Sequence, residues 1–321
     1  MTTVAPASTR AVDRATWDQL VATSPQGSVF TTSAFLDALD LDWSGLVVGG
    51  EAPRLGAVIL RDPSGEIARS PIPFTQYQGV LLGGELTRAA PHRMVHESLE
   101  LVGQLLASLE TERRVSWSLH HAFTDIRPFS WFNYHAPERG QFRVEVRYSG
   151  LIPIDATGMD GVLARSRATR RQEYRKASDR FAVAPTTDLD LLDQLHARTF
   201  DRQGLTRPAR EVALLRRIAG AAIREGFGEL LAGIDRDGRP AGAVLFLFDR
   251  GSAYYLIAAN DPEFRATGIS TLMVLAGIER GIRRGVRQVD VVGMNSPSRG
   301  DFKSSFGAIP VPYYQVHWER P

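Results

Sequence analysis

One of the chain's two lysines, Lys303, lies in the motif Asp-Phe-Lys-Ser-Ser-Phe-Gly at residues 301–307. Lysine and arginine together number 38, so arginine supplies nearly every other cation. A compact ammonium on a flexible stem can reach a single oxygen, whereas the planar guanidinium group requires a different donor geometry. The rarity of lysine indicates that Lys303 has a role that arginine cannot fill; the competing interpretation is a solvated surface charge.

The segment Arg165–Arg180 is strongly cationic, with seven basic residues against Glu173 and Asp179. If it is helical, the spacing i, i+3, i+4 and i+7 places four side chains on one side: Arg167, Arg170, Arg171 and Tyr174. Such a face could follow the phosphates of a nucleic acid. The alternative is a solvated helix face whose charge is balanced by acids elsewhere.

Two carboxylates, Asp125 and Asp301, are candidates to accept a proton, and the sequence does not choose between them. Asp290 alternates into an expected strand, which fits a structural role as well as a catalytic one. The vicinal pair His120-His121 is expected on a strand, where successive side chains point to opposite faces, so joint metal ligation is not expected. No phosphate-binding P-loop, nucleophile-elbow serine or dinucleotide fingerprint is present. We therefore expect no metal, no redox cofactor and no tightly bound cofactor.

An internal repeat in the sequence predicts the fold that positions the candidate residues. The stretches 46–60 and 231–247 each read as strand, tight turn, strand. Each is followed by an amphipathic helix, 92–112 or 268–284, and then by a strand, 115–119 or 286–292. This repetition predicts two similar α/β domains of mixed sheet, 1–155 and 156–321, with a long basic helix over 161–181 opening the second.

Length and composition are those of an ordinary globular protein: 321 residues, 43% hydrophobic and 23% charged. The zero cysteine count excludes disulfides, thiolate ligands and a cysteine nucleophile. Residues 1–11 lack the features of a secretory signal, and no apolar run approaches the roughly 20 residues of a membrane span. A cytoplasmic protein is the expectation.

The C-terminal motif carries a family resemblance. Residues 293–307, followed by Val-Pro-Tyr-Tyr at 311–314, are similar to the Phe-Lys-x-x-Phe-Gly ending of the FemABX-like group. Trp17 and the stretches 28–30, 77–79 and 125–131 also resemble the first domain of that group. In these proteins two GNAT-type domains are fused in one chain, so the resemblance implies two tandem GNAT-like domains.

The resemblance implies transfer of an activated acyl group to an amine, which forms an amide. It places Lys303 near the tetrahedral oxyanion and Phe302 in the wall of the channel. Fem-type members use an Arg-x-x-x-Tyr arrangement to hold phosphates of the acceptor substrate, and Arg170 and Tyr174 match that spacing. The site predicted in this way has Lys303, Phe302 and Asp125 as catalytic residues and six substrate-binding residues: Tyr77, Gln78, Arg170, Tyr174, Asn295 and Asp301.

The acyl donor is left open between acyl-CoA and aminoacyl-tRNA. GNAT enzymes usually cradle the CoA pyrophosphate on an Arg/Gln-x-x-Gly-x-Gly/Ala loop at a helix N-terminus. The nearest match is Arg265-Ala-Thr-Gly268-Ile-Ser270, in which Ser270 adds bulk where a small residue is usual. The alternative interpretation is that Gly268 only marks the start of a helix. Residues 200–227 have room for one ordinary helix rather than a long arm, so tRNA would be contacted through Arg165–Arg180.

Three functions follow, in order of preference. The first is a Fem-like transferase that uses aminoacyl-tRNA, the second an acyl-CoA-dependent enzyme acting on a small amine or sugar amine, and the third a non-catalytic RNA- or sugar-binding descendant. Lys303 argues against the third, because a chain that had lost catalysis would have little reason to retain lysine there. The acceptor is expected to be an amine-bearing small molecule or a cell-wall or antibiotic precursor.

Overall fold

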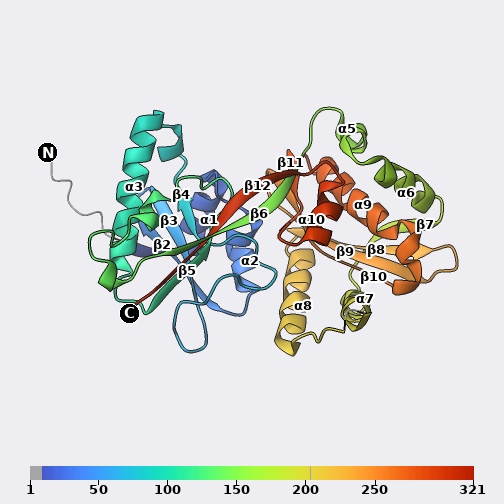
Figure 1. Cartoon of the computed structure of the whole chain (residues 1–321), viewed down its shortest axis with the longest axis horizontal. Helices are drawn as coiled ribbons and strands as arrows, with labels where there is room; N and C mark the ends of the chain where they lie inside the picture. The colour runs from blue at the N-terminus through green and yellow to red at the C-terminus, as the bar shows by residue number, and fades with distance from the viewer. Residues whose placement is uncertain (1–8, 203) are drawn as a thin grey trace. The chain divides into compact units, whose positions relative to one another are not determined.

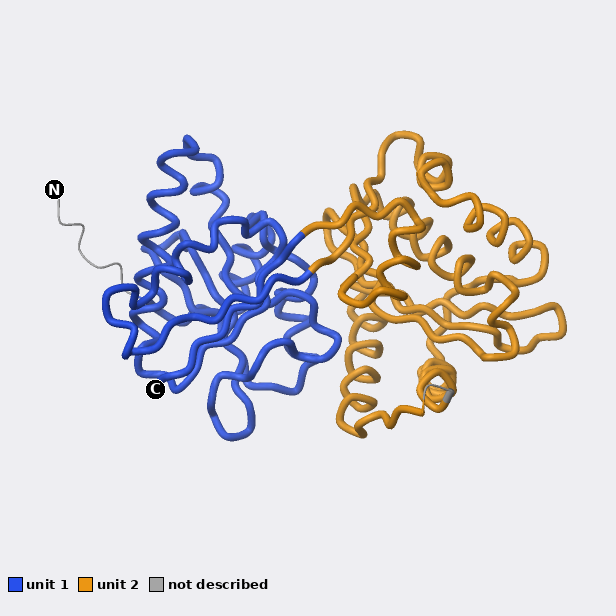
Figure 2. Tube along the Cα trace, in the orientation of Figure 1, with its two compact units in different colours: residues 1–147, 312–321 blue, residues 148–311 orange. Residues whose placement is uncertain are grey.

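The computed structural model describes residues 9–202 and 204–321, and it divides the chain into two compact units (Figures 1 and 2). Unit 1 comprises residues 1–147 and 312–321, and unit 2 comprises residues 148–311. The predicted division at 155/156 therefore differs from these units at two places. The larger difference arises because strand β12 (Ile309–Glu319) pairs antiparallel with β5 (Arg114–Ser118), which holds the last residues in unit 1.

Unit 1 is built on an antiparallel sheet of order β1-β2-β3-β4 and on the pair β5 and β12. The four strands are β1 (Thr9–Val12), β2 (Asp42–Val48), β3 (Leu55–Arg61) and β4 (Val80–Leu82). The α-helices are α1 (Arg14–Thr23), α2 (Ser33–Asp37), α3 (Pro91–Ser108) and α4 (Arg127–Ser130), and the short 3-10 helices are η1 (Val29–Thr31), η2 (Leu86–Arg88) and η3 (Pro137–Arg139). The apolar face of α3 is buried in one core with side chains of β3, β5 and β12.

Unit 2 has a mixed sheet of order β6-β11-β10-β9-β8-β7. Its strands are β6 (Arg143–Pro153, in this unit from Tyr148), β7 (Phe181–Thr186), β8 (Gly228–Asp235), β9 (Pro240–Phe248), β10 (Ser252–Asn260) and β11 (Gln288–Asp290). β10 and β11 pair in parallel, whereas β7–β8, β8–β9, β9–β10 and β6–β11 are antiparallel. The hairpins predicted over 46–60 and 231–247 are confirmed as β2–β3 and β8–β9.

Helices cover both faces of the sheet in unit 2. Phe246 of β9 belongs to the core that includes α9 (Ile269–Arg283), while its neighbours Leu245 and Leu247 point to the other face and are also fully buried. On that side α7 (Leu189–Arg202) packs on β9 and β10, and α8 (Ala209–Arg224) on β8. Figure 1 shows α9 on one side of these strands and α7 and α8 on the other. The prediction of one ordinary helix in 200–227 is confirmed by α8.

The long basic helix predicted over 161–181 is wrong. The structure has two helices, α5 (Gly158–Arg165) and α6 (Ala168–Ser178). The break falls at Ser166 and Arg167, whose ψ angles of 148° and 143° are extended rather than helical. The Arg167 N–H donates instead to the carbonyl of Ser305, at 2.8 Å. Arg167 therefore precedes α6 and does not share a continuous helical face with the later arginines.

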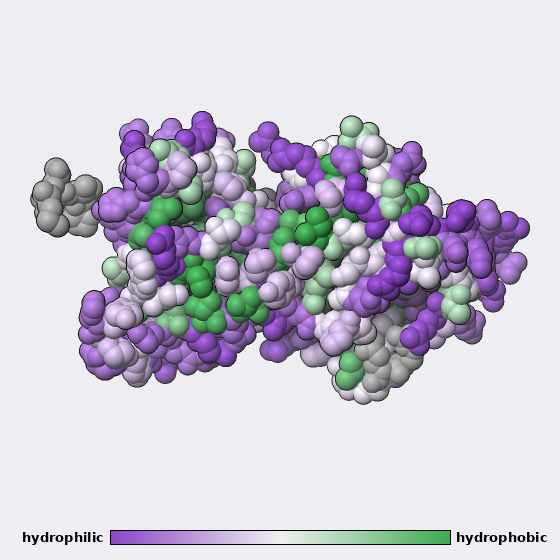
Figure 3. All heavy atoms as spheres, turned by 45° about the horizontal axis from the view of Figure 1, so that its top comes forward, coloured by the Kyte–Doolittle hydropathy of each residue, from purple (hydrophilic) through white to green (hydrophobic). Residues whose placement is uncertain are grey.

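Most apolar side chains are used inside the two units. The large apolar residues that remain exposed are scattered: Trp131, Tyr134, Val146, Tyr148, Leu205, Ile234 and Ile309. On the face drawn in Figure 3, hydrophilic residues cover most of the surface and apolar ones gather in small patches. Within the part of the chain that the structure describes, we find no helix with both the length and the apolar character needed to span a bilayer.

Candidate active site around Lys303

The sheet of unit 2 becomes irregular directly after β11, where the chain turns at Val292 and Gly293. Both residues have positive φ, 50° and 74° respectively. Glycine adopts this left-handed conformation readily, but for a β-branched valine it is a true outlier. Strain of this kind is retained where the surrounding structure imposes it, and it clusters at functional sites. The strained turn is therefore a first indication of a functional site in this part of unit 2.

Lys303 is held against this turn by α10 (Pro297–Ser304). Its Nζ donates to the carbonyl of Val292 and, at 2.9 Å, to the carbonyl of Gly293. Nζ also lies 5.4 Å from the ring centroid of Tyr255. An ammonium group has three hydrogens, so these two bonds fix the direction of the third. The third N–H of the ammonium group therefore has a fixed direction and is available as a positively charged hydrogen-bond donor.

Burial lowers the pKa of Lys303 to about 8, from an ordinary value of 10.5. The positive charge of Arg299 acts in the same direction, and the buried carboxylate of Asp290 acts in the opposite one. A lysine with such a pKa is mainly protonated at neutral pH and can release its proton just above it. This property suits a group that must donate a strong hydrogen bond during a reaction.

Phe302, which precedes Lys303 in α10, packs against Phe306 and Arg170. The ring of Phe302 meets that of Phe306 edge to face, with centroids 5.1 Å apart. The Arg170 guanidinium lies 5.1 Å from the Phe302 centroid and donates to Glu173 at 2.6 Å and to Thr271 at 2.8 Å. The charge of Arg170, which we predicted to hold phosphates, is therefore already engaged inside the unit. Tyr174 packs against the hydrophobic core of unit 2.

Asp301 forms an exposed bidentate ion pair with Arg167, at 2.7 and 3.1 Å. The hydrogen bonds and the charge of Arg167 lower the pKa of Asp301. A carboxylate with a lowered pKa is a weaker base, so this pair makes Asp301 less fit to take a proton from an amine.

Asn295 uses its side chain to continue the sheet. Its Oδ1 accepts from the backbone N–H of Tyr148 at 2.8 Å, and its Nδ2 donates to the carbonyl of the same residue at 3.1 Å. The amide group thus reproduces both bonds of a backbone pairing with β6. The structure gives Asn295 this architectural contact, and its predicted role in binding substrate stays a prediction.

The loop predicted to hold a pyrophosphate is covered by α6. Arg265 lies in the 3-10 helix η4 (Pro262–Thr267), and Gly268, at φ 82°, opens α9. A Cβ built on Gly268 would lie only 2.9 Å from the backbone oxygen of Glu173 in α6. Thr271 donates to the Glu173 carboxylate, and Ser270 accepts from Asn260 at 2.8 Å.

These contacts do not fit a CoA pyrophosphate. A helix N-terminus attracts anions through its exposed N–H groups and its dipole. Here the carboxylate of Glu173 is bonded within the first turn of α9, and the α6 backbone occupies the space beside Gly268. A pyrophosphate would meet the packed backbone of α6 and a carboxylate that is already bonded to Arg170 and Thr271. Gly268 accordingly serves as the left-handed residue at which α9 begins.

Of the three predicted residues of unit 1, Tyr77 and Gln78 are buried and Asp125 is partly exposed. Tyr77 is 1% exposed, and its ring packs edge to face on Phe30 and Tyr313. Gln78 is 2% exposed, and its Nε2 donates to Ser70 at 2.6 Å. Asp125 pairs with Arg127 at 2.6 Å, and the Arg127 hydrogen bonds lower its pKa. Tyr77 and Gln78 therefore read as core residues, and Asp125 as a weak base.

The prediction that His120 and His121 point to opposite faces is wrong. β5 ends at Ser118, so the two histidines lie beyond the pleat that would separate them. Their ring centroids are 4.1 Å apart. Among the described residues, no group of three or more histidine, cysteine, aspartate or glutamate side chains is arranged to hold a metal ion.

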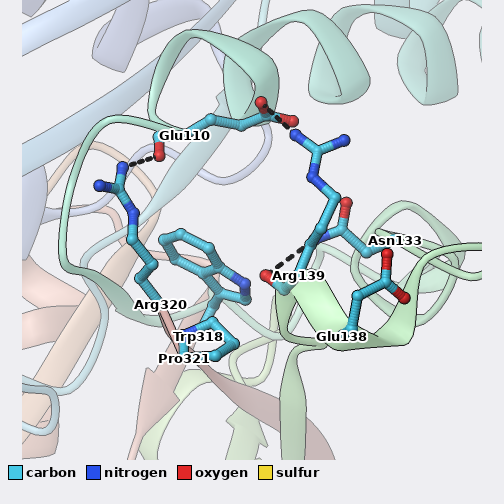
Figure 4. Close-up of a pocket in the computed structure, with 7 residues that line it drawn as sticks. All are labelled: Glu110, Asn133, Glu138, Arg139, Trp318, Arg320 and Pro321. Carbon is cyan, nitrogen blue, oxygen red and sulfur yellow. Dashed lines mark hydrogen bonds and ion pairs between the residues drawn. The ribbon is translucent and has the colours of Figure 1, made fainter.

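Unit 1 also contains a pocket of about 290 Å³, drawn in Figure 4. It is lined by Glu110, Asn133, Glu138, Arg139, Trp318, Arg320 and Pro321. Arg139 pairs with the Glu110 carboxylate at 2.7 Å, and Arg320 donates to the Glu110 carbonyl. The Trp318 indole donates to the carbonyl of Gly140 at 3.1 Å. Because its main charges are engaged with one another, we place no chemistry there.

The predicted site residues of unit 2 stay a prediction, and the contacts around Lys303 involve further residues. Asp301, Phe302 and Lys303 are consecutive in α10, and Arg170 packs on the Phe302 ring. Sequence reasoning assigned no role to Ser149, Thr271 or Val292, it left the role of Asp290 open, and it counted Glu173 only as a charge. The glycine in Val-Gly at 292–293 is a turn signal that could have marked the bend.

Known proteins resemble this chain in sequence over one stretch and in fold over most of its length. Residues 164–304 match the family model described as "Acetyltransferase (GNAT) domain". No curated protein matches the sequence.

Among solved structures, FemX superposes with a TM-score of 0.69 at 14% identity, over 96% of this chain and 96% of that one. A conserved protein of unknown function from Bacteroides thetaiotaomicron gives 0.56 at 11% identity, over 98% and 100%. L-PGS from Bacillus licheniformis gives 0.51 at 9%, over 95% and 91%. Residues 164–304 are therefore similar to a GNAT acetyltransferase domain, and the chain as a whole has the fold of FemX.

Proposed function

We propose that the protein is an aminoacyltransferase that forms an amide between an aminoacyl group, delivered by aminoacyl-tRNA, and an amine acceptor. The observation that supports this choice of donor is the contact of α6 with the first turn of α9, where the backbone and carboxylate of Glu173 lie against Gly268 and Thr271. The likeness to FemX over 96% of the chain supports the same choice, because Fem-type proteins use aminoacyl-tRNA.

In this reaction the amine nitrogen attacks the ester carbonyl of the donor. The C–N bond forms, the carbonyl oxygen takes up negative charge, and the C–O bond to the tRNA then breaks. The amine loses a proton, and the departing tRNA hydroxyl gains one. The aimed N–H of Lys303 is suited to the developing oxyanion, since Val292 and Gly293 hold the ammonium in place before the charge appears.

Fewer basic side chains over residues 165–180 are available to tRNA than the sequence predicted. Arg165 pairs with Asp155 at 2.7 Å, and Arg167 and Arg170 pair with Asp301 and Glu173. Arg175, Lys176 and Arg180 are exposed. We propose that these three supply the phosphate contacts, and that the acceptor is an amine-bearing cell-wall or antibiotic precursor.

Thermal unfolding with each donor tests the proposal. Charged and uncharged tRNA are expected to raise the melting temperature, with a gain that shrinks as salt rises from low to moderate concentration. Acetyl-CoA and free CoA are expected to leave it unchanged. Replacing Arg175 and Lys176 by alanine should reduce the gain from tRNA. Replacing Arg216 and Arg224 of α8 removes the same charge elsewhere in unit 2 and should not.

The match to an acetyltransferase domain model favours one alternative, an acyl-CoA-dependent N-acyltransferase acting on a small amine or sugar amine. Stabilisation by acetyl-CoA but not by tRNA would replace the proposal with this alternative. A non-catalytic RNA-binding protein would be stabilised by tRNA but would not discharge labelled aminoacyl-tRNA in the presence of amine acceptors.

A further inference from the structure

The turn that holds Lys303 is itself held from the opposite side by two buried residues, Asp290 and Ser149. Both are 0% exposed. Asp290 Oδ1 accepts from the Val292 N–H at 2.8 Å and also from the Ser149 hydroxyl. The Gly293 N–H in turn donates to Ser149 Oγ at 3.2 Å. Asp290 and Ser149 thus bind the two N–H groups of the turn, while Lys303 binds its two carbonyls.

The turn is a bulge in the pairing of β11 with β6. Val291 N–H donates to Gly150 at 2.9 Å, and Met294 N–H donates to Tyr148 at 2.8 Å. Between these bonds the β11 side has two residues and the β6 side has only Ser149. A bulge bends the strand and re-aims the groups in it, and such features are common beside active sites. Here it turns two carbonyls toward one ammonium.

We propose that Asp290, acting with Ser149, is a positioning residue for Lys303. Its carboxylate accepts from the N–H of Val292 and so fixes the strained bulge whose carbonyls bind the ammonium group. Its negative charge also balances the positive charge of that group. This inference deepens the proposed function and rests on it. The charged and titratable groups around Lys303 are Asp290, Arg299 and Tyr255. Asp290 is the one whose charge raises the pKa of Lys303, against the effect of burial.

The test uses the scarcity of lysine in this chain. In a Lys176→Arg background, protein labelled with [ε-¹³C]lysine carries a single side-chain signal, that of Lys303. Asp290→Asn keeps the shape and an acceptor for the Val292 N–H but removes the charge. The titration midpoint of Lys303 is expected to fall relative to the parent. Amide formation at pH 7 should slow roughly 10- to 100-fold through kcat, with KM little changed, because the donor is misplaced and partly deprotonated.

Asp235→Asn is a matched control. Asp235 is also mostly buried, at 8% exposure, and also fixes a turn, since its Oδ1 accepts from Asp237 N–H at 3.0 Å and from Arg239 N–H at 2.8 Å. It belongs to the same unit but lies in the β8–β9 hairpin. Its replacement should leave the Lys303 midpoint and kcat unchanged.

The inference is wrong if Asp290→Asn moves the Lys303 midpoint no further than Asp235→Asn does. Should Asp290→Asn fail to fold, Ser149→Ala provides the second variant, because it removes the acceptor of the Gly293 N–H and keeps the charge. It is expected to shift the Lys303 signal and to lower kcat, and an unchanged spectrum would overturn the inference. The titration requires no substrate, so an absence of amide formation in the wild type would contradict the proposed function alone.

Discussion

Replacing Lys303 by alanine is expected to abolish amide formation and to leave the protein folded. Alanine removes the one donor aimed by the Val292–Gly293 turn, and losing such a donor costs about 3 kcal/mol of transition-state stabilisation, or more than a hundredfold in rate. The fold should survive because the removed charge is one that burial destabilises. Turnover with charged tRNA, and the melting temperature of the same sample, measure the two effects separately.

Lys303→Arg is expected to fail nearly as badly as alanine. A guanidinium is planar and spreads its donors over a fork, so it cannot place one point charge between two adjacent carbonyls. Lys176→Arg, the same change on the exposed surface of α6, is the control: arginine keeps the cation that the proposed phosphate contact needs, so this variant should stay active. Full activity in Lys303→Arg would contradict the argument that the compact ammonium is required.

The second large effect is a dependence of stability on pH. Folded Lys303 has a pKa of about 8, whereas the ordinary value is 10.5. Between these values the unfolded chain binds more protons than the folded one, so the free energy of unfolding rises with pH. Below pH 8 both states are protonated and the cost of burying the charge is fully present. Between pH 8 and 10.5 the contribution of Lys303 to the free energy of unfolding therefore rises by about 3 kcal/mol.

The measurement is the difference in unfolding free energy between wild type and Lys303→Met, taken by denaturant titration at several pH values. Methionine has a similar length and no charge, and the two carbonyls that it leaves without this donor cost the same at every pH. Groups other than Lys303 cancel in the difference. We expect the wild type to gain on the variant between pH 8 and 10.5, and a flat difference would show that the ammonium is not buried as the structure has it.

Local patterns predicted the repeated part of the fold well. The hairpins β2–β3 and β8–β9 follow from strand alternation around glycine-containing turns, and α3 and α9 follow from apolar periodicity. These elements are determined mainly by their own residues. The Phe-Lys-x-x-Phe-Gly motif likewise singles out Lys303, because the residues that form it are consecutive in the chain.

What sequence reasoning missed depends on contacts between distant segments. The helix break at Ser166 is stabilised by a bond from Arg167 to Ser305, which lies 138 residues away in the chain. Positive φ at Val292 is unfavourable by itself and is imposed by Ser149, Asp290 and Lys303 together. In the sequence, Glu173 is one acid in a basic segment. Only the structure shows that it packs on α9, and this contact is what argues against CoA binding.

The pairing of β12 with β5 makes the order of synthesis important for this protein. Strand β5 ends at residue 118, but its partner residues 315–319 are made almost 200 residues later. At roughly 5–20 residues per second, the nascent chain spends many seconds with that strand edge unpaired. All of unit 2 is made during this interval, so unit 1, whose synthesis begins first, is completed only after unit 2.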